Sequence, residues 1–146
     1  MTLLAGEVVT ADRLARLQST VWRIISDDNL TLTTTETDIP GASVTVTTVA
    51  DDAVYTVVGV FDMDTSSTGG GILQGRLEVA GVTQTEEAHG RGETTGRDTN
   101  VMTWNGTLGA AGEHVFTLRG QRTGASGTQI IRAVHTNAIV TIYEVV

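Results

Sequence analysis

Length, composition and charge exclude several classes of protein. The chain has 146 residues, 40% of them hydrophobic, which suits one folded domain. It has no cysteine, so disulfide frameworks, thiolate metal sites and thiol nucleophiles are excluded. A net charge of −8 disfavours nucleic-acid binding, because phosphate binding needs clustered positive charge. No apolar run approaches the roughly 18 residues of a membrane helix and no signal-peptide pattern opens the chain, so we expect no membrane partner and synthesis in a cytoplasm.

The first predicted element is an amphipathic helix that begins after Thr10 and ends near Asp27. Thr10 is a suitable N-cap, and Asp12 complements the positive end of the helix dipole. Apolar residues then recur with the period of a helix and form one stripe, with Trp22 beside it as a second apolar contact. The predicted interface residues of this helix are Leu14, Leu17, Val21, Trp22, Ile24 and Ile25.

Two interpretations of this helix stay open. Its stripe either packs on the protein's own sheet, or forms a three-fold bundle or docks on a larger assembly. A polar break at residues 26–29 can act as a hinge between two parts of the chain. We therefore predict a helical attachment and oligomerisation segment over residues 1–28 and a β-sandwich domain over residues 29–146.

After Asp28 the hydrophobic period changes from that of a helix to two. Alternation of threonine with leucine or valine in residues 30–34 and 43–48 predicts strands with one buried and one solvated face. The run at residues 53–61 is apolar on both faces, which predicts a central strand covered on both sides. Residues 72–79, the Ala80-Gly81 turn and residues 82–85 predict a hairpin.

Four further short runs follow, and Gly-rich turns separate them. They lie near Val101, from His114, from Gln129 and from Ala138, where the last run reaches the end of the chain. Because it is strongly apolar, the last run predicts an interior strand or a subunit contact. So many short strands without helical patterns between them predict an all-β fold, an antiparallel jelly-roll-like β-sandwich of eight or nine strands preceded by the one N-terminal helix.

No stretch of the chain presents a catalytic, cofactor or metal-binding pattern. The acidic residues and histidine of residues 86–98 alternate with glycine and threonine, which predicts a solvated loop. His114 and His135 lie at predicted strand positions and are read as ordinary sheet residues. Asp62 and Asp64 are read as solvated acids at a strand end, since the spacing of a calcium loop is absent. We expect no enzyme activity and no cofactor.

Three short segments resemble phage proteins. Residues 5–14, AGEVVTADRL, resemble the start of tail-fibre, head-fibre and other appendage proteins of tailed phages. Residues 116–120 and 139–145 are similar to parts of small virion proteins of actinobacterial phages, whose C-terminal portion is similar to trimeric TNF/C1q-like jelly rolls. The resemblance implies a virion role. Independently, all nine basic residues are arginine, which fits a phage of a high-GC host.

The leading hypothesis is a non-enzymatic capsid decoration or head-accessory protein. As a homotrimer it would bind the major capsid protein or other virion proteins and stabilise the particle, which is assembled in the host cytoplasm. The alternative is a tail-tip or fibre module that binds a host surface glycan or protein through its loops. For that alternative Trp104, followed by Asn105-Gly106, is the best-placed ligand platform.

Overall fold

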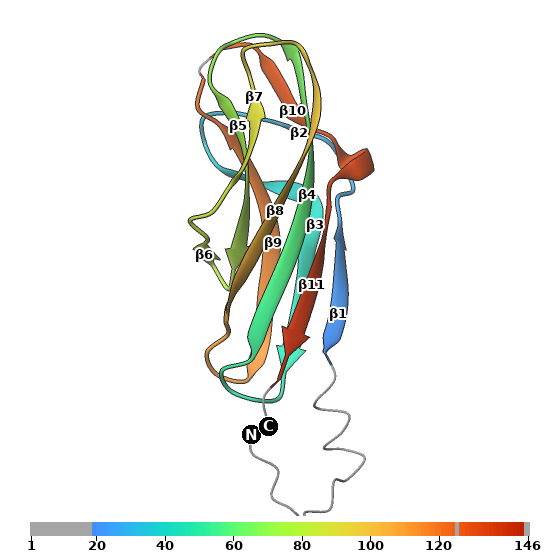
Figure 1. Cartoon of the computed structure of the whole chain (residues 1–146), viewed down its shortest axis with the longest axis vertical. Helices are drawn as coiled ribbons and strands as arrows, with labels where there is room; N and C mark the ends of the chain where they lie inside the picture. Colours follow the sequence, from blue (N-terminus) through green and yellow to red (C-terminus); the bar gives the residue numbers. More distant parts are fainter. Residues whose placement is uncertain (1–18, 125, 145–146) are drawn as a thin grey trace, which may run out of the picture.

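The computed structural model describes residues 19–124 and 126–144 as two antiparallel sheets that form a curled sandwich (Figure 1). Within these residues the only helical element is one 3-10 turn, and no helix is long and apolar enough to cross a membrane. The elements are β1 (Thr20–Ile25), β2 (Leu30–Thr31), β3 (Thr37–Thr48), β4 (Val54–Ser67), β5 (Ile72–Val79), β6 (Val82–Thr83), β7 (Ala88–Arg91), β8 (Gly96–Thr107), β9 (Gly112–Arg122), β10 (Thr128–Ile131), η1 (Ala133–His135) and β11 (Asn137–Tyr143).

The first sheet, sheet A, is organised around the long strand β4. Along one edge β4 pairs with β8 over its whole length, and along the other it pairs first with β11 and then with β10. Strand β1 pairs with β11 and β2 pairs with β10, so both lie at the margin of the sheet. Half of sheet A therefore has the order β1, β11, β4, β8, and Figure 1 shows these four strands side by side.

The second sheet, sheet B, has the order β3, β9, β5, and β5 then pairs with both β6 and β7. The β5–β6 connection is a tight turn in which Ala80 and Gly81 both have positive φ, the geometry of the hairpin turns that match strand twist. The predicted hairpin at residues 72–85 is confirmed. The central position predicted for residues 53–61 is confirmed by β4, and the interior position of the last strand is confirmed by β11 between β1 and β4.

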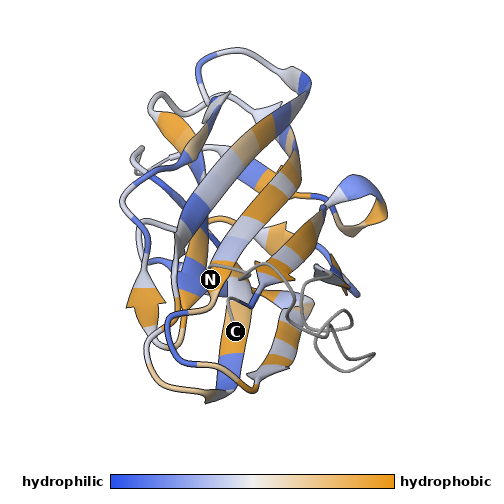
Figure 2. Ribbon diagram, turned by 60° about the horizontal axis from the view of Figure 1, so that its bottom comes forward, coloured by the Kyte–Doolittle hydropathy of each residue, from blue (hydrophilic) through white to orange (hydrophobic). Residues whose placement is uncertain are grey.

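The core lies between the sheets, where alternate residues of each strand point inward. In Figure 2 hydrophobic and hydrophilic bands alternate along the strands, as period-two side-chain placement requires. Val57 and Phe61 of β4 face Phe116 and Leu118 of β9, and all four side chains are fully buried. Phe61 packs directly on Gly75 of β5, where an added Cβ would lie 2.5 Å from the ring.

The predicted helix is wrong for its C-terminal part, because residues 20–25 form strand β1. Thr20–Ile25 pairs with β11 in an unbroken antiparallel register that runs from Thr20↔Ile142 to Ile25↔Asn137. The segment TVWRII is rich in β-branched and aromatic residues, which favour a strand. The part of the predicted helix that contains Leu14 and Leu17 lies outside the described residues. The attachment role of residues 1–28 therefore stays a prediction.

The predicted hinge at residues 26–29 is held to the sandwich by hydrogen bonds. Ser26 Oγ donates hydrogen bonds to the carbonyl oxygens of Asp28 and Pro40, and the Asp27 amide donates to Pro40 O at 2.9 Å. Asn29 Oδ1 accepts a hydrogen bond from the Ala133 amide. These bonds tie the break to β3 and η1, so the polar sequence marks a bonded turn.

Candidate interaction surface

The outward face of sheet A is the most unusual surface of the molecule. Residues that are paired across neighbouring strands point to the same side of a sheet, so the register identifies the residues of this face. We define the apolar face as the outward positions of β1, β11, β4 and β8, which form four cross-strand rows: Tyr143, Val54, Thr107; Val21, Thr141, Thr56, Asn105; Arg23, Ile139, Val58, Thr103; and Ile25, Asn137, Val60, Val101.

Large hydrophobic side chains are exposed on this face. More than half of the exposed large hydrophobic residues in the described part of the chain lie here, although β4 and β11 are interior strands. Arg23 is the one charged residue among the positions of the apolar face. The exposed fractions are 60% for Val21, 59% for Ile25, 40% for Val54, 38% for Val58, 60% for Val101, 39% for Ile139 and 48% for Tyr143. An apolar surface of this kind marks an interaction site.

Two ion pairs end the apolar face at its upper margin, next to η1. The Asp62 carboxylate is completely buried and accepts two hydrogen bonds from the Arg97 guanidinium, one of them at 2.6 Å from Nε. Asp64, two residues along β4, accepts hydrogen bonds from Arg132 at 2.5 and 2.9 Å. Both aspartates are therefore neutralised members of the sheet, and the prediction that they are solvated strand-end acids is wrong.

The outward face of sheet B has the opposite character, because it carries an ionic network. Arg119 of β9 lies within 2.8 Å of both Asp38 and Glu78 and 3.7 Å from Glu36. Its cross-strand neighbour Arg76 binds Glu87. The sandwich thus has one outer face that is nearly free of charge and another on which charged side chains form salt bridges with one another.

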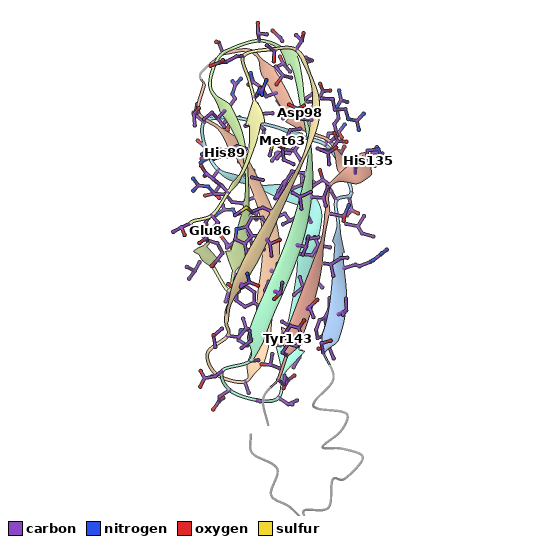
Figure 3. All side chains as sticks on the ribbon, in the orientation of Figure 1. Met63, Glu86, His89, Asp98, His135 and Tyr143 are labelled. Atoms are coloured by element: carbon purple, nitrogen blue, oxygen red, sulfur yellow. The ribbon has the colours of Figure 1, made fainter. Side chains whose placement is uncertain are left out.

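Glu87 is the shared acceptor for Arg76 and its neighbours in that network. Its carboxylate accepts hydrogen bonds from Gln74 and Arg76, and lies 2.5 Å from His89 Nε2. Burial alone would raise the pKa of Glu87, but the bonds from His89, Arg76 and Gln74, together with the positive charge of Arg76, lower this pKa below its ordinary value of 4.5. Residues 88–91 form β7, so the predicted solvated loop is wrong here, and Asp98 lies in β8. In Figure 3 Glu86 and His89 lie on this side of the molecule.

We expect Glu87→Ala to lower the free energy of unfolding by about 2 kcal/mol at neutral pH, because Arg76 and Gln74 lose a shared charged acceptor. Since the folded-state pKa lies below the unfolded one, this contribution is present above pH 4.5 and is lost as the pH falls through the folded pKa. Urea denaturation of both proteins at neutral and acid pH measures it. Glu93→Ala, at an exposed position in the same stretch, is the control and should change little. Equal stabilities at neutral pH would contradict this role of Glu87.

Trp104 is not a ligand platform, because it lies in the core with only 2% of its surface exposed. Its ring meets Phe61 edge to face at a centroid distance of 6.2 Å, and its Nε1 donates a hydrogen bond to Glu86 O at 2.8 Å. Tyr55 is also buried, and Trp22 packs partly buried against the core. Tyr143, at the lower end of β11 in Figure 3, is the exposed aromatic residue of the described chain.

The other predicted interface residues divide between two surfaces. Val21 and Ile25 lie on the apolar face, whereas Ile24 is buried in the core at 1% exposure. Residues of the apolar face on β4, β8 and β11 were not predicted as interface residues. The signal that could have found them is the second apolar side of β4, formed by Val54, Val58 and Val60.

His89, His114 and His135 lie on three different elements, β7, β9 and η1. His114 of β9 lies 3.3 Å from Thr48 Oγ1 of β3, as expected for a sheet residue. His135 lies on η1 and is exposed, so its predicted strand position is wrong (Figure 3). Within residues 19–124 and 126–144, no group of three or more His, Asp or Glu side chains is arranged to hold a metal ion.

Comparisons with known proteins bear on the fold. No family model and no curated protein matches the sequence. Solved structures that resemble this one include a chain of the T13 infectious bursal disease virus particle, with a TM-score of 0.54, 14% identity and coverage of 86% of this chain and 31% of that one. Another is murine APRIL, a TNF-family jelly roll, with a TM-score of 0.51, 9% identity and coverage of 87% and 100%.

A third match is dimeric latent PorU from Porphyromonas gingivalis, with a TM-score of 0.50 and 9% identity over 86% of this chain and 13% of that one. The chain thus spans less than a third of both the viral and the bacterial protein. At these identities the likeness shows the fold alone. It is consistent with a jelly-roll-like arrangement of the two antiparallel sheets.

Proposed function

We propose that this protein is a non-enzymatic structural component of a virion, a capsid decoration or head-accessory protein that binds the particle surface as a homotrimer. The observation that carries the proposal is the division of the sandwich into the apolar face and the ionic outer face of sheet B. A protein fixed in an assembly buries one surface and leaves another in water, and these two faces meet that requirement.

Two further observations support the virion role. The jelly roll is shared with a chain of the infectious bursal disease virus particle. Residues 5–14 resemble the start of tailed-phage appendage proteins. The use of arginine and no lysine fits a phage of a high-GC host. We take this host to be an actinobacterium, in whose cytoplasm the particle is assembled. With Trp104 buried, the glycan-binding alternative loses the aromatic residue that was best placed for it.

The stabilising mechanism is shared burial of apolar area. Each copy that joins the assembly buries apolar surface against other copies and against the shell, at about 25 cal/mol for every Å² buried. Because the protein binds only the assembled shell, it shifts the assembly equilibrium toward the shell. The ionic face of sheet B, directed outward, keeps the decorated particle soluble. Electron microscopy of particles made with and without the gene tests the proposal. Particles that lack the protein should lose density on the outer surface of the head and release their genome at a lower temperature.

Removing residues 1–18 is expected to abolish attachment while the sandwich stays folded. Within residues 19–124 and 126–144 the structure already has two sheets around a common core, so we expect the truncated protein to keep its thermal unfolding transition. A longer deletion through residue 26 would remove β1 and is not a clean test. Co-sedimentation of the truncated protein with particles that lack it measures attachment. Undiminished binding would contradict the attachment role of these residues.

A further inference from the structure

We infer that the apolar face is the surface through which copies of this chain bind one another around the three-fold axis of the proposed homotrimer, its occupant being a second copy of this chain. The inference rests on the proposed homotrimer and names the surface that forms it. Edge strands β1 and β8 border the face, and each pairs with one strand only within the described chain. The middle of the face is made by the interior strands β11 and β4, which are paired on both sides, so packing of side chains is the interaction that it offers there.

The charge distribution favours a second copy as the partner. Each chain has a net charge of −8, so two copies repel unless they meet where carboxylates are absent. No carboxylate lies among the positions of the apolar face, and Arg23 on the marginal strand β1 is its one charge. If copies associated through the outward face of sheet B instead, Glu36, Asp38 and Glu78 of each copy would come close together. An anionic partner such as a nucleic acid or an acidic lipid surface would find one arginine to bind, which is too little.

The kinds of side chain on the face also suit packing between sheets. Most of its positions are valine, isoleucine or threonine, whose β-branched side chains are stiff and lose little rotamer freedom when they are covered. Threonine in the row Val21, Thr141, Thr56, Asn105 keeps the free face wettable. The apolar face can therefore be exposed to water in the free chain and can exclude water when another copy covers it.

The size of the face sets the strength that we expect. Four strands about 4.8 Å apart, over seven residues at about 3.4 Å each, cover roughly 450 Å². A partner in a standard stable interface contributes about 800 Å². Copies held by this face alone should therefore associate reversibly, and the assembly should dissociate on dilution.

The test compares two matched valine substitutions on opposite faces. Val58 on the apolar face is 38% exposed, and Val115 on the outward face of sheet B is 44% exposed, and both lie within strands. We expect Val58→Asp to raise the dissociation constant of the assembly at least about tenfold and to leave mainly monomer at micromolar concentration. Val115→Asp should associate as the unmodified chain does. Sedimentation equilibrium measures both, and circular dichroism verifies that each variant is folded.

The outcomes separate this inference from the proposed function. A trimer that Val58→Asp leaves intact overturns the assignment of the face, while the homotrimer itself stands. An unmodified chain that is monomeric throughout the micromolar range contradicts the homotrimer and the inference together. If Val58→Asp does not fold, Thr103→Arg at an exposed position of the same row replaces it, with the same loss of association expected. Equal loss of association in Val115→Asp would show that any added carboxylate disrupts the assembly and would also overturn the inference.

Discussion

Ile24→Asp is expected to destabilise the sandwich severely. Ile24 lies near the C-terminal end of β1, opposite Ala138 of β11, with 1% of its surface exposed, and belongs to the core. A carboxylate at this position would be desolvated among apolar side chains, at a cost of roughly 4 kcal/mol or more. Domains of this size have only about 5–15 kcal/mol of stability in total, so the substitution removes a large part of it. The shift or loss of the cooperative transition in urea measures the effect.

The neighbouring substitution Ile25→Asp is the matched control. Ile25 is the same residue type on the same strand, but it is 59% exposed on the apolar face. Ile25→Asp should therefore change the free energy of unfolding by less than about 1 kcal/mol. In a helix the two residues would lie 100° apart on one stripe and respond alike, whereas in a strand they point to opposite sides. Similar stabilities of the two variants would contradict β1 as a strand.

The β-strands that alternate in sequence were predictable from that alternation alone. Period two between apolar and polar residues located β3, and the Ala80-Gly81 turn located the β5–β6 hairpin. Residues 20–25 failed because Val21, Ile24 and Ile25 satisfy helical spacing while the segment is too short to show a clear strand period. The β-branched composition of TVWRII was the competing signal, and pairing with β11 decided the outcome.

The features of the two outer faces depend on contacts between residues that are distant in the sequence, and the local sequence pattern does not reveal these contacts. Glu87 looked like part of a solvated loop because its partners Gln74 and Arg76 come from another strand. Residues 53–61 were predicted to be covered on both sides because both sides are apolar. Within the described chain the side of β4 that carries Val58 is not covered. Sequence identifies an apolar side, but only the arrangement of the sheets shows whether the chain itself covers it.

Trp104→Ala is expected to lower the free energy of unfolding by about 3–5 kcal/mol. The indole is 2% exposed, packs edge to face on Phe61 and lies so close to Gly59 that an added Cβ there would be 2.7 Å from it. The substitution leaves a cavity beneath β8 and removes the donor to Glu86 O. Urea denaturation monitored by far-ultraviolet circular dichroism measures the loss.

Two further variants separate the role of the ring from that of its hydrogen bond and from that of an exposed aromatic residue. Trp104→Phe keeps an aromatic ring in the core but loses the bond to Glu86 O, so it should cost less than Trp104→Ala. Tyr143→Ala removes a ring that is 48% exposed on the apolar face and should cost little in the unfolding of the monomer. If Trp104→Ala kept the stability of the unmodified chain, the indole could not be the buried anchor between β4 and β8 that its contacts indicate. A core role requires the order Trp104→Ala, Trp104→Phe, Tyr143→Ala, from the largest loss to the smallest, because the amount of buried surface that each substitution removes decreases in the same order.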